Sequence, residues 1–183
     1  MTTASKRIAG APSALAGLAA AMAIGACAPA LDWRETRPEG TEVAMLFPCR
    51  PERQERSVKV GDDVIALRLF SCTAAGAAFA LAAADVSEPG RVTPLLEALR
   101  GQVVANVGGI ATIEVLPALP GATPNAQSAR VRIVGKRRDG RRVVEHALFF
   151  VKGLTLFQAT VIGADEAAGR EAIETFFDSI RLP

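Results

Sequence analysis

The chain has 183 residues, of which 50% are hydrophobic and 22% charged, and its formal net charge at pH 7 is +2. Two of its 21 basic side chains, Lys6 and Arg7, lie in the first seven residues, so residues 27–183 carry 19 basic and 19 acidic groups. A nucleic-acid-binding domain is normally strongly basic. The charge balance therefore argues against nucleic acid as a partner.

Residues 1–26 are typical of a secretory signal peptide. Lys6 and Arg7 give a positively charged start, an Ala-, Gly- and Leu-rich stretch follows, and small residues precede Cys27; this is the usual three-part order. A permanent membrane-spanning helix needs about 20 predominantly apolar residues, and Gly10 and Pro12 interrupt this stretch. We expect the segment to be removed after export.

The end of this segment, Ile24-Gly25-Ala26-Cys27, resembles the lipobox of bacterial lipoproteins. The resemblance implies cleavage between Ala26 and Cys27 and acylation of Cys27, with fatty acids such as palmitate. Two or three acyl chains hold a protein stably on a membrane, since each buried methylene contributes about 0.8 kcal/mol. Ala28 stands where Asp would favour the inner membrane, so the resemblance implies the outer membrane, facing the periplasm. Ordinary cleavage at an A-x-A site is the alternative.

The remaining chain is predicted to have a lipidated, flexible tether over residues 27–41 and a single domain over residues 42–183, which is long enough to bury a core. Alternating or short apolar runs bounded by turn residues predict strands. Alanine leaves helix as an alternative for one of them, 78–86. The predicted strands span 43–47, 57–60, 64–70, 78–86, 110–116, 130–133, 143–151 and 154–162. Gly61-Asp62 predicts a turn, and Asp139-Gly140 predicts a two-residue hairpin turn.

Two segments have the apolar period of an amphipathic helix. Thr93-Pro94 predicts an N-cap followed by proline at the first helical position, and Gly108-Gly109 ends that helix. The second helix is predicted to begin at Asp165 as its N-cap. Its apolar face comprises Ala168, Ala172, Ile173, Phe176, Phe177 and Ile180.

These elements predict an α+β domain, with an antiparallel sheet of about six to eight strands and two main α-helices packed on it. The opening apolar strand that ends in Pro48, the succession of hairpins and the closing Phe176-Phe177-Asp178-Ser179-Ile180 segment resemble the PsbP-like fold. That fold also includes small bacterial envelope lipoproteins. The resemblance implies an accessory or assembly role, and it transfers no catalytic residues.

Cys49 and Cys72 remain as an even pair if Cys27 is lipidated. In an oxidising compartment such a pair predicts a disulfide, which closes a loop of about 24 residues and contributes about 3 kcal/mol to stability. Two free buried thiols are the alternative. The chain has no Cys-x-x-Cys spacing to indicate a redox-active pair.

The sole histidine, His146, lies in the middle of a predicted strand. If Glu145 faces water, alternation places His146 on the same side as Leu148 and Phe150, which predicts a packed residue. Catalysis is the alternative, and we assign no catalytic residue. Asp62-Asp63 is interpreted as turn chemistry, with calcium as the alternative. Zinc-type Cys/His spacings are absent from the sequence, so we expect no metal and no cofactor.

Five basic residues surround the predicted turn at Asp139-Gly140: Lys136, Arg137, Arg138, Arg141 and Arg142. Beside an anionic membrane surface, each would add roughly 1 kcal/mol of attraction. A solvated hairpin tip that keeps the sheet edge soluble is the alternative.

The sequence therefore predicts the cellular location and the fold of the protein more directly than its biochemical activity. We expect a non-enzymatic accessory or interaction domain that contacts the membrane through its lipid anchor and has an envelope protein as partner. The first alternative is a small-molecule or lipid-binding domain with an apolar cleft between helix and sheet. The second is a hydrolase that uses His146. The oligomeric state is not predicted.

Overall fold

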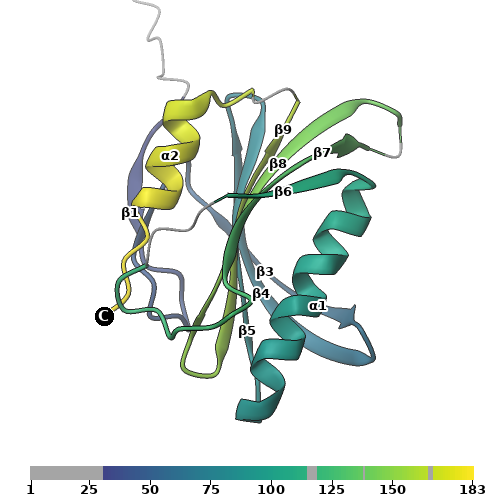
Figure 1. The fold of residues 1–183 in the computed structure, drawn as a ribbon. Helices are drawn as coiled ribbons and strands as arrows, with labels where there is room; N and C mark the ends of the chain where they lie inside the picture. The colour runs from purple at the N-terminus through teal and green to yellow at the C-terminus, as the bar shows by residue number, and fades with distance from the viewer. Residues whose placement is uncertain (1–30, 115–118, 138, 165–166) are drawn as a thin grey trace, which may run out of the picture.

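The computed structural model describes residues 31–114, 119–137, 139–164 and 167–183, and it confirms the α+β prediction. A seven-stranded antiparallel sheet has the order β3-β4-β5-β9-β8-β7-β6, and a separate two-stranded sheet joins β1 and β2 (Figure 1). The elements are β1 Arg34–Thr36, β2 Met45–Phe47, β3 Glu52–Val60, β4 Asp63–Ala74, β5 Ala77–Asp85, α1 Pro89–Val107, β6 Ile110–Glu114, β7 Ala129–Lys136, β8 Arg142–Lys152, β9 Thr155–Gly163 and α2 Arg170–Asp178.

The large sheet is covered on both faces, and each face has its own hydrophobic cluster. Helix α1 packs on one face, over residues such as Val131, Ile133 and Phe149. Helix α2 and the β1-β2 pair pack on the other face, over a cluster rich in phenylalanine (Figure 1). Because side chains alternate along a strand, neighbouring residues of the inner strands enter different clusters.

Helix α1 begins one turn earlier than predicted. Glu88 is its extended N-cap residue and Pro89 occupies the first turn, so the predicted start at Thr93-Pro94 is wrong and Pro94 lies inside the helix. A proline there removes one helical hydrogen bond, but the added turn buries Val92 in the core, which offsets that loss. The predicted end is confirmed, since Gly108 closes the helix in the left-handed conformation, with φ of 58°.

Part of the predicted tether is folded. Arg34–Thr36 pairs with Met45–Phe47 as a strand, the Asp32 N–H donates to the Pro48 carbonyl at 2.8 Å, and the Trp33 ring packs edge-on against Phe79. The expectation of flexibility up to residue 41 is therefore wrong from residue 32 onwards. One aromatic contact and a short strand pairing outweigh a composition rich in charge and proline.

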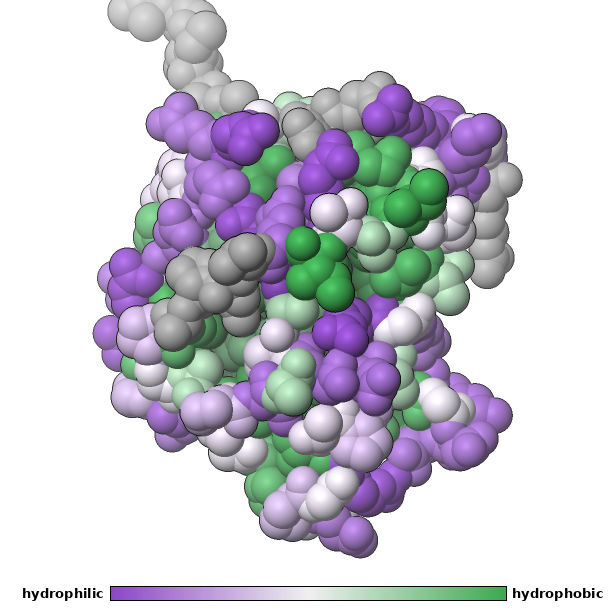
Figure 2. All heavy atoms as spheres, viewed as in Figure 1, coloured by the Kyte–Doolittle hydropathy of each residue, from purple (hydrophilic) through white to green (hydrophobic). Residues whose placement is uncertain are grey.

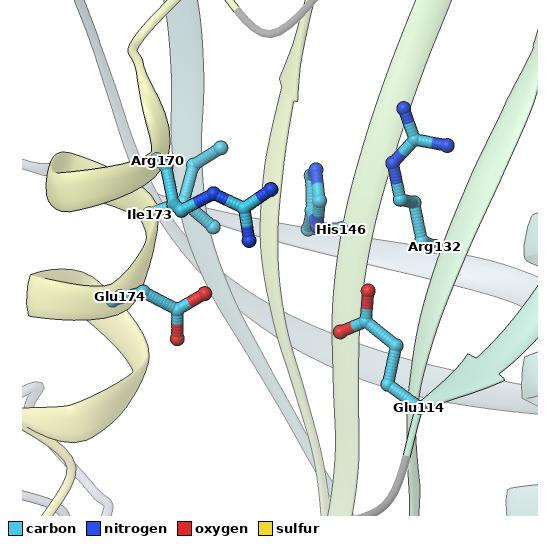
Figure 3. Close-up of a pocket in the computed structure, with 6 residues that line it drawn as sticks. All are labelled: Glu114, Arg132, His146, Arg170, Ile173 and Glu174. Atoms are coloured by element: carbon cyan, nitrogen blue, oxygen red, sulfur yellow. The ribbon is translucent and has the colours of Figure 1, made fainter.

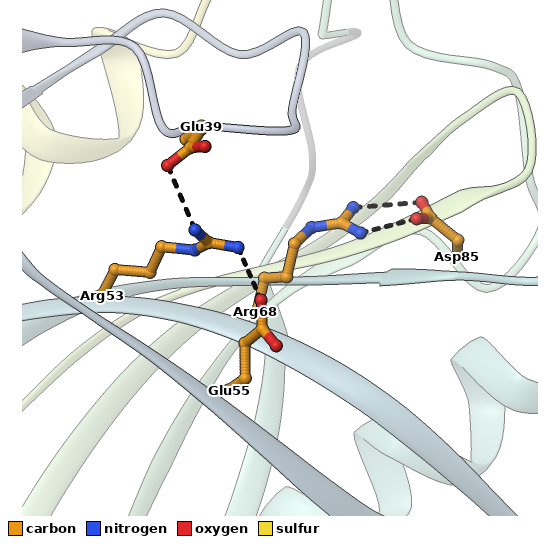
Figure 4. A network of polar contacts seen from close by, with 5 residues as sticks. All are labelled: Glu39, Arg53, Glu55, Arg68 and Asp85. Atoms are coloured by element: carbon orange, nitrogen blue, oxygen red, sulfur yellow. Dashed lines mark hydrogen bonds and ion pairs between the residues drawn. The ribbon is translucent and has the colours of Figure 1, made fainter.

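A polar network also holds this segment on the sheet (Figure 4). Arg68 of β4 donates two hydrogen bonds to Asp85 of β5, at 2.6 and 3.1 Å, and Arg53 of β3 bridges Glu39 and Glu55 at 3.1 and 2.5 Å. The bonds from Arg68 hold the pKa of the Asp85 carboxyl below its usual value. The Glu39–Arg53 pair ties the loop after β1 to β3, and the Arg68–Asp85 pair joins β4 to β5.

The predicted disulfide is confirmed. Cys49 and Cys72 are bonded, with their Cα atoms 6.0 Å apart. The bond joins the segment after β2 to β4, and Cys72 packs against the phenylalanine-rich cluster. The disulfide therefore links the small sheet covalently to the large one.

Two turn and boundary predictions differ from the structure. The connection between β7 and β8 spans residues 137–141, where the Gly140 N–H donates to the Arg137 carbonyl at 2.9 Å, so the predicted two-residue turn is wrong. Strand pairing stops at Lys136 and Arg142, which leaves a wider loop. Helix α2 begins at Arg170. Asp165 and the predicted strand residues beyond Glu114 lie outside the described residues.

Candidate functional site

A cleft of about 250 Å³ lies between α1 and the sheet. Its helix wall comes from Leu99, Gln102, Val103 and Asn106, whose spacing of three and four residues places them on one side of a helix. Its sheet wall comes from five neighbouring strands: Val58 of β3, Leu67 and Leu69 of β4, Ala82 of β5, Gln158 of β9 and Glu145 of β8.

Small and medium-sized side chains create this space. Ala82 lies opposite Leu69 on one side and Gln158 on the other, so the middle of the sheet wall carries a methyl group where a larger side chain would reach α1. The cleft is partly open to solvent and lies on the α1 face of the sheet.

Glu145 lines the cleft and is buried. The sequence analysis placed His146 inside on the condition that Glu145 faces water, but Glu145 is also only 5% exposed because α1 covers that face of β8. Burial alone raises the pKa of the Glu145 carboxyl to about 7. Among the described residues, no hydrogen bond or ion pair engages this carboxyl group.

The other polar side chains of the described lining are neutral. The Gln158 side-chain N–H donates to the Thr160 hydroxyl at 2.9 Å, which leaves the Gln158 carbonyl oxygen as an acceptor. Gln102 and Asn106 add amide groups from the helix wall. Within the described part of the lining, the cleft thus combines an apolar surface with one carboxyl group and no basic residue, an arrangement that binds ligands by burial and directed hydrogen bonds.

His146 is confirmed as a packed residue on the opposite face. It is 7% exposed and lies between Arg132 of β7 and Arg170 of α2 (Figure 3). Together with Glu114, Ile173 and Glu174, these residues line a cavity of about 60 Å³. This small polar cavity has room for little more than a few waters.

Arg130 neutralises the two acids of that cavity. Its Nε lies 3.0 Å from the Glu114 carboxylate, and its Nη1 and Nη2 donate to Glu174 at 2.7 and 2.8 Å. The guanidinium also lies 4.7 Å from the centre of the Phe177 ring. These bonds hold the pKa of Glu174 below its usual value. The α2 face therefore has compensated charges, whereas the carboxyl group on the α1 face is uncompensated.

The other predicted site residues do not form a second site with these two. Lys136, Arg137, Arg141 and Arg142 lie at the β7–β8 connection, where Asp139 pairs with Arg141 at 2.6 Å. Arg138 lies outside the described residues, as do Ala26 and Cys27. Asp63 forms an ion pair with Arg91 of α1. Across the described ranges, no group of three or more His, Cys, Asp or Glu side chains is placed to hold a metal ion.

The sequence analysis offered a cleft between helix and sheet as an alternative, but it named none of the lining residues and missed Glu145, although one signal was present. Residues 143–151 are almost continuously apolar, with Glu145 and His146 as the polar exceptions. Such a run is typical of a strand that is buried on both faces, and β8 is buried along almost its whole length. That pattern would have predicted a buried Glu145 as well as a buried His146.

No family model matches the chain, and no curated protein matches it significantly. Within the described residues, neither helix is long and apolar enough to cross a membrane.

Proposed function

We propose that this chain is an exported, lipid-anchored protein that binds a small amphipathic molecule in the cleft beneath α1. The observation that carries the proposal is the cleft itself: about 250 Å³, mostly apolar, with Glu145 and three amide side chains converging on it. Ligand sites in proteins have this character, since apolar walls supply affinity and a few placed polar groups fix orientation.

The proposed location in the cell envelope is supported by the N-terminal sequence and by the disulfide. Ile24-Gly25-Ala26-Cys27 has the lipobox pattern, and a Cys49–Cys72 bond is stable in an oxidising compartment such as the periplasm. An anchor on Cys27 would place the domain next to a membrane, on the periplasmic side of the outer membrane. A binding protein held there is close to lipids and to molecules that cross the envelope.

We propose binding and not catalysis because of the residues that the cleft contains. Its described lining has no Ser, Cys, Lys or His side chain that could act as a nucleophile or a base. His146 adjoins Glu145 in sequence, but it lies on the opposite face of the sheet. The two groups therefore do not act on one ligand.

Cleft-filling variants test this proposal. Protein purified from bacterial membranes would be analysed by native mass spectrometry for bound small molecules, with Ala82→Leu and Val103→Phe narrowing the cleft from its two walls. Loss of a bound species in both folded variants is expected. Ligand-free wild-type protein, or equal retention by both variants, would contradict the proposal. The intact mass of the same sample tests for residues 27–183 plus acyl chains.

An interaction with an envelope protein is the second candidate, and the edge strand β6 favours it. Ile110 and Ile113 are 80% and 67% exposed, and Figure 2 shows hydrophobic side chains at the surface in this region. Within the described residues, no strand pairs with the outer side of β6, and such edges bind extended segments of partners. A cross-link between this protein and an envelope protein, formed in membranes by the wild type and lost in an Ile113→Lys variant, would support this interaction.

A further inference from the structure

The charge distribution in the α1 cleft indicates which ligands fit it. Among the described lining residues, Glu145 carries the sole ionisable group of a mostly apolar cleft. A buried carboxylate without a partner costs several kcal/mol. A ligand that supplies hydrogen-bond donors at this point would recover that cost on binding.

Basic side chains of the neighbouring elements have other partners. Arg100 of α1 donates to Gln127 at 3.2 and 2.6 Å, and Arg91 pairs with Asp63. Arg56 of β3 donates to Gln54 at 2.6 Å. Glu97 of α1 is exposed and does not line the cleft. The chain therefore offers the Glu145 carboxyl no cation of its own within the described residues.

We infer that the cleft selects a ligand with an amino group on a short apolar chain, bound through its N–H donors to the Glu145 carboxylate. This inference rests on the proposed ligand-binding function. An ammonium group has three donors and no acceptor, which complements a carboxylate, whose two oxygens only accept. Its hydrogen bonds to a carboxylate are about twice as strong as neutral ones, and the apolar chain would lie against Leu67, Leu69 and Leu99.

The same lining disfavours other amphiphiles. A fatty acid would place a second carboxylate beside Glu145, with no described basic residue in the lining to separate the two charges. A neutral alcohol has one donor and leaves most of the acceptor capacity of the carboxylate unused. Preference should therefore fall in the order amine, alcohol, carboxylate.

Three probes with one apolar chain test this order: octylamine, octanol and octanoate, titrated calorimetrically into the purified full-length protein at pH 8. Wild-type protein is expected to bind octylamine at least tenfold more tightly than octanol, and octanoate most weakly. Glu145→Gln keeps the shape of the side chain and removes its charge. It should weaken octylamine binding about tenfold and change octanol binding less than threefold.

Glu97→Gln on the exposed side of α1 is the matched control, because it removes the same charge away from the cleft; octylamine binding should not change. If octylamine and octanol bind equally, or if Glu97→Gln weakens the amine as much as Glu145→Gln, the amine preference is wrong while the cleft remains a binding site. If none of the three probes binds, or if Ala82→Leu leaves their binding unchanged, the proposed function itself fails.

Discussion

The two faces of the large sheet are built on different principles. On the α2 face, Phe47, Phe79 and Phe177 surround Phe176 with ring centres 5.3 to 5.5 Å apart, and the partly buried charge of Arg130 is matched by two acids. On the α1 face, smaller side chains leave a cleft of about 250 Å³, and a buried carboxyl group has no partner among the described residues.

This contrast separates a face that stabilises the protein from a face that is available for binding. A tightly packed face gains stability from every methylene group, whereas spare volume and an uncompensated polar group both reduce stability. Proteins retain such features mainly at functional sites. The small cavity beside His146 contains more charges, but because Arg130 pairs with both of its acids it is the weaker candidate for a ligand site.

The largest expected effect is on the α2 face. Phe176→Ala removes a fully buried ring and should lower the free energy of unfolding by about 3–5 kcal/mol. Urea denaturation measures the loss. Leu99→Ala, at the wall of the cleft, should cost only about 2 kcal/mol, because the side chain already borders open space. Equal losses at the two positions would contradict the distinction between the faces.

Glu145 should make the stability of the protein fall as the pH rises. Its pKa is raised from 4.5 in the unfolded chain to about 7 in the folded protein. The folded state therefore binds more protons between these values, and unfolding releases them. Stability from this group is complete below pH 4.5 and decreases as the pH rises through 7, by about 2–3 kcal/mol between pH 5 and pH 8.

Glu145→Gln isolates this contribution, since the amide does not titrate. The free energy of unfolding of the variant, measured in urea at pH 5 and pH 8, should lack the decrease and exceed that of the wild type at pH 8. If the free energy of unfolding of the wild type and of Glu145→Gln changed in parallel with pH, the carboxyl group would not be desolvated in solution.

Adjacent alanines of β5 provide a matched test of free volume. Ala82 lines the cleft, whereas Ala83 is fully buried in the phenylalanine-rich cluster of the other face. Ala83→Leu overfills a packed core and should cost about 1–3 kcal/mol. Ala82→Leu should change stability by less than about 1 kcal/mol, because its added carbons enter the cleft. Thermal melts of both variants measure the difference, and a reversed order would locate the free volume on the wrong face.

The sequence predicts the helices and strands of this fold more successfully than it predicts which segments pack on each face of the sheet. Alternation between turn residues located the strands from β3 to β9, and the oxidised pair followed from Cys49 and Cys72. The folding of residues 32–36 was missed because it depends on Trp33 meeting Phe79, a contact between segments far apart in the chain. Helix α1 was shortened by a turn because Pro94 was interpreted as a start signal.

The residues that line the candidate site were missed for a related reason. Alternation along β8 correctly separates Glu145 from His146, but it does not show which side faces water, and here neither does. Residues 99–106 of helix α1 cover the Glu145 face of β8. Which face the helix covers depends on the order of the strands in the sheet, and the local sequence pattern does not contain that order. The cleft depends on Ala82 lying between Leu69 and Gln158, and strand register sets that arrangement.

The smallest effect concerns the paired charges of the α2 face. Arg130→Met keeps the apolar stem but removes the partner of Glu114 and Glu174. It should cost about 1–2 kcal/mol, less than a fully buried pair, since both acids are partly exposed. Because Arg130 lowers the pKa of Glu174, this contribution is present above pH 4.5 and is lost as the pH falls through the lowered value. Its pH dependence is thus opposite to that of Glu145.

Arg37→Met, in the exposed pair with Glu35, is the control and should have almost no effect on the free energy of unfolding. Urea unfolding at pH 3 and pH 7 would measure both variants, and an Arg130→Met loss that persists unchanged at pH 3 would show that Arg130 stabilises the face by packing on Phe177 and not by its charge.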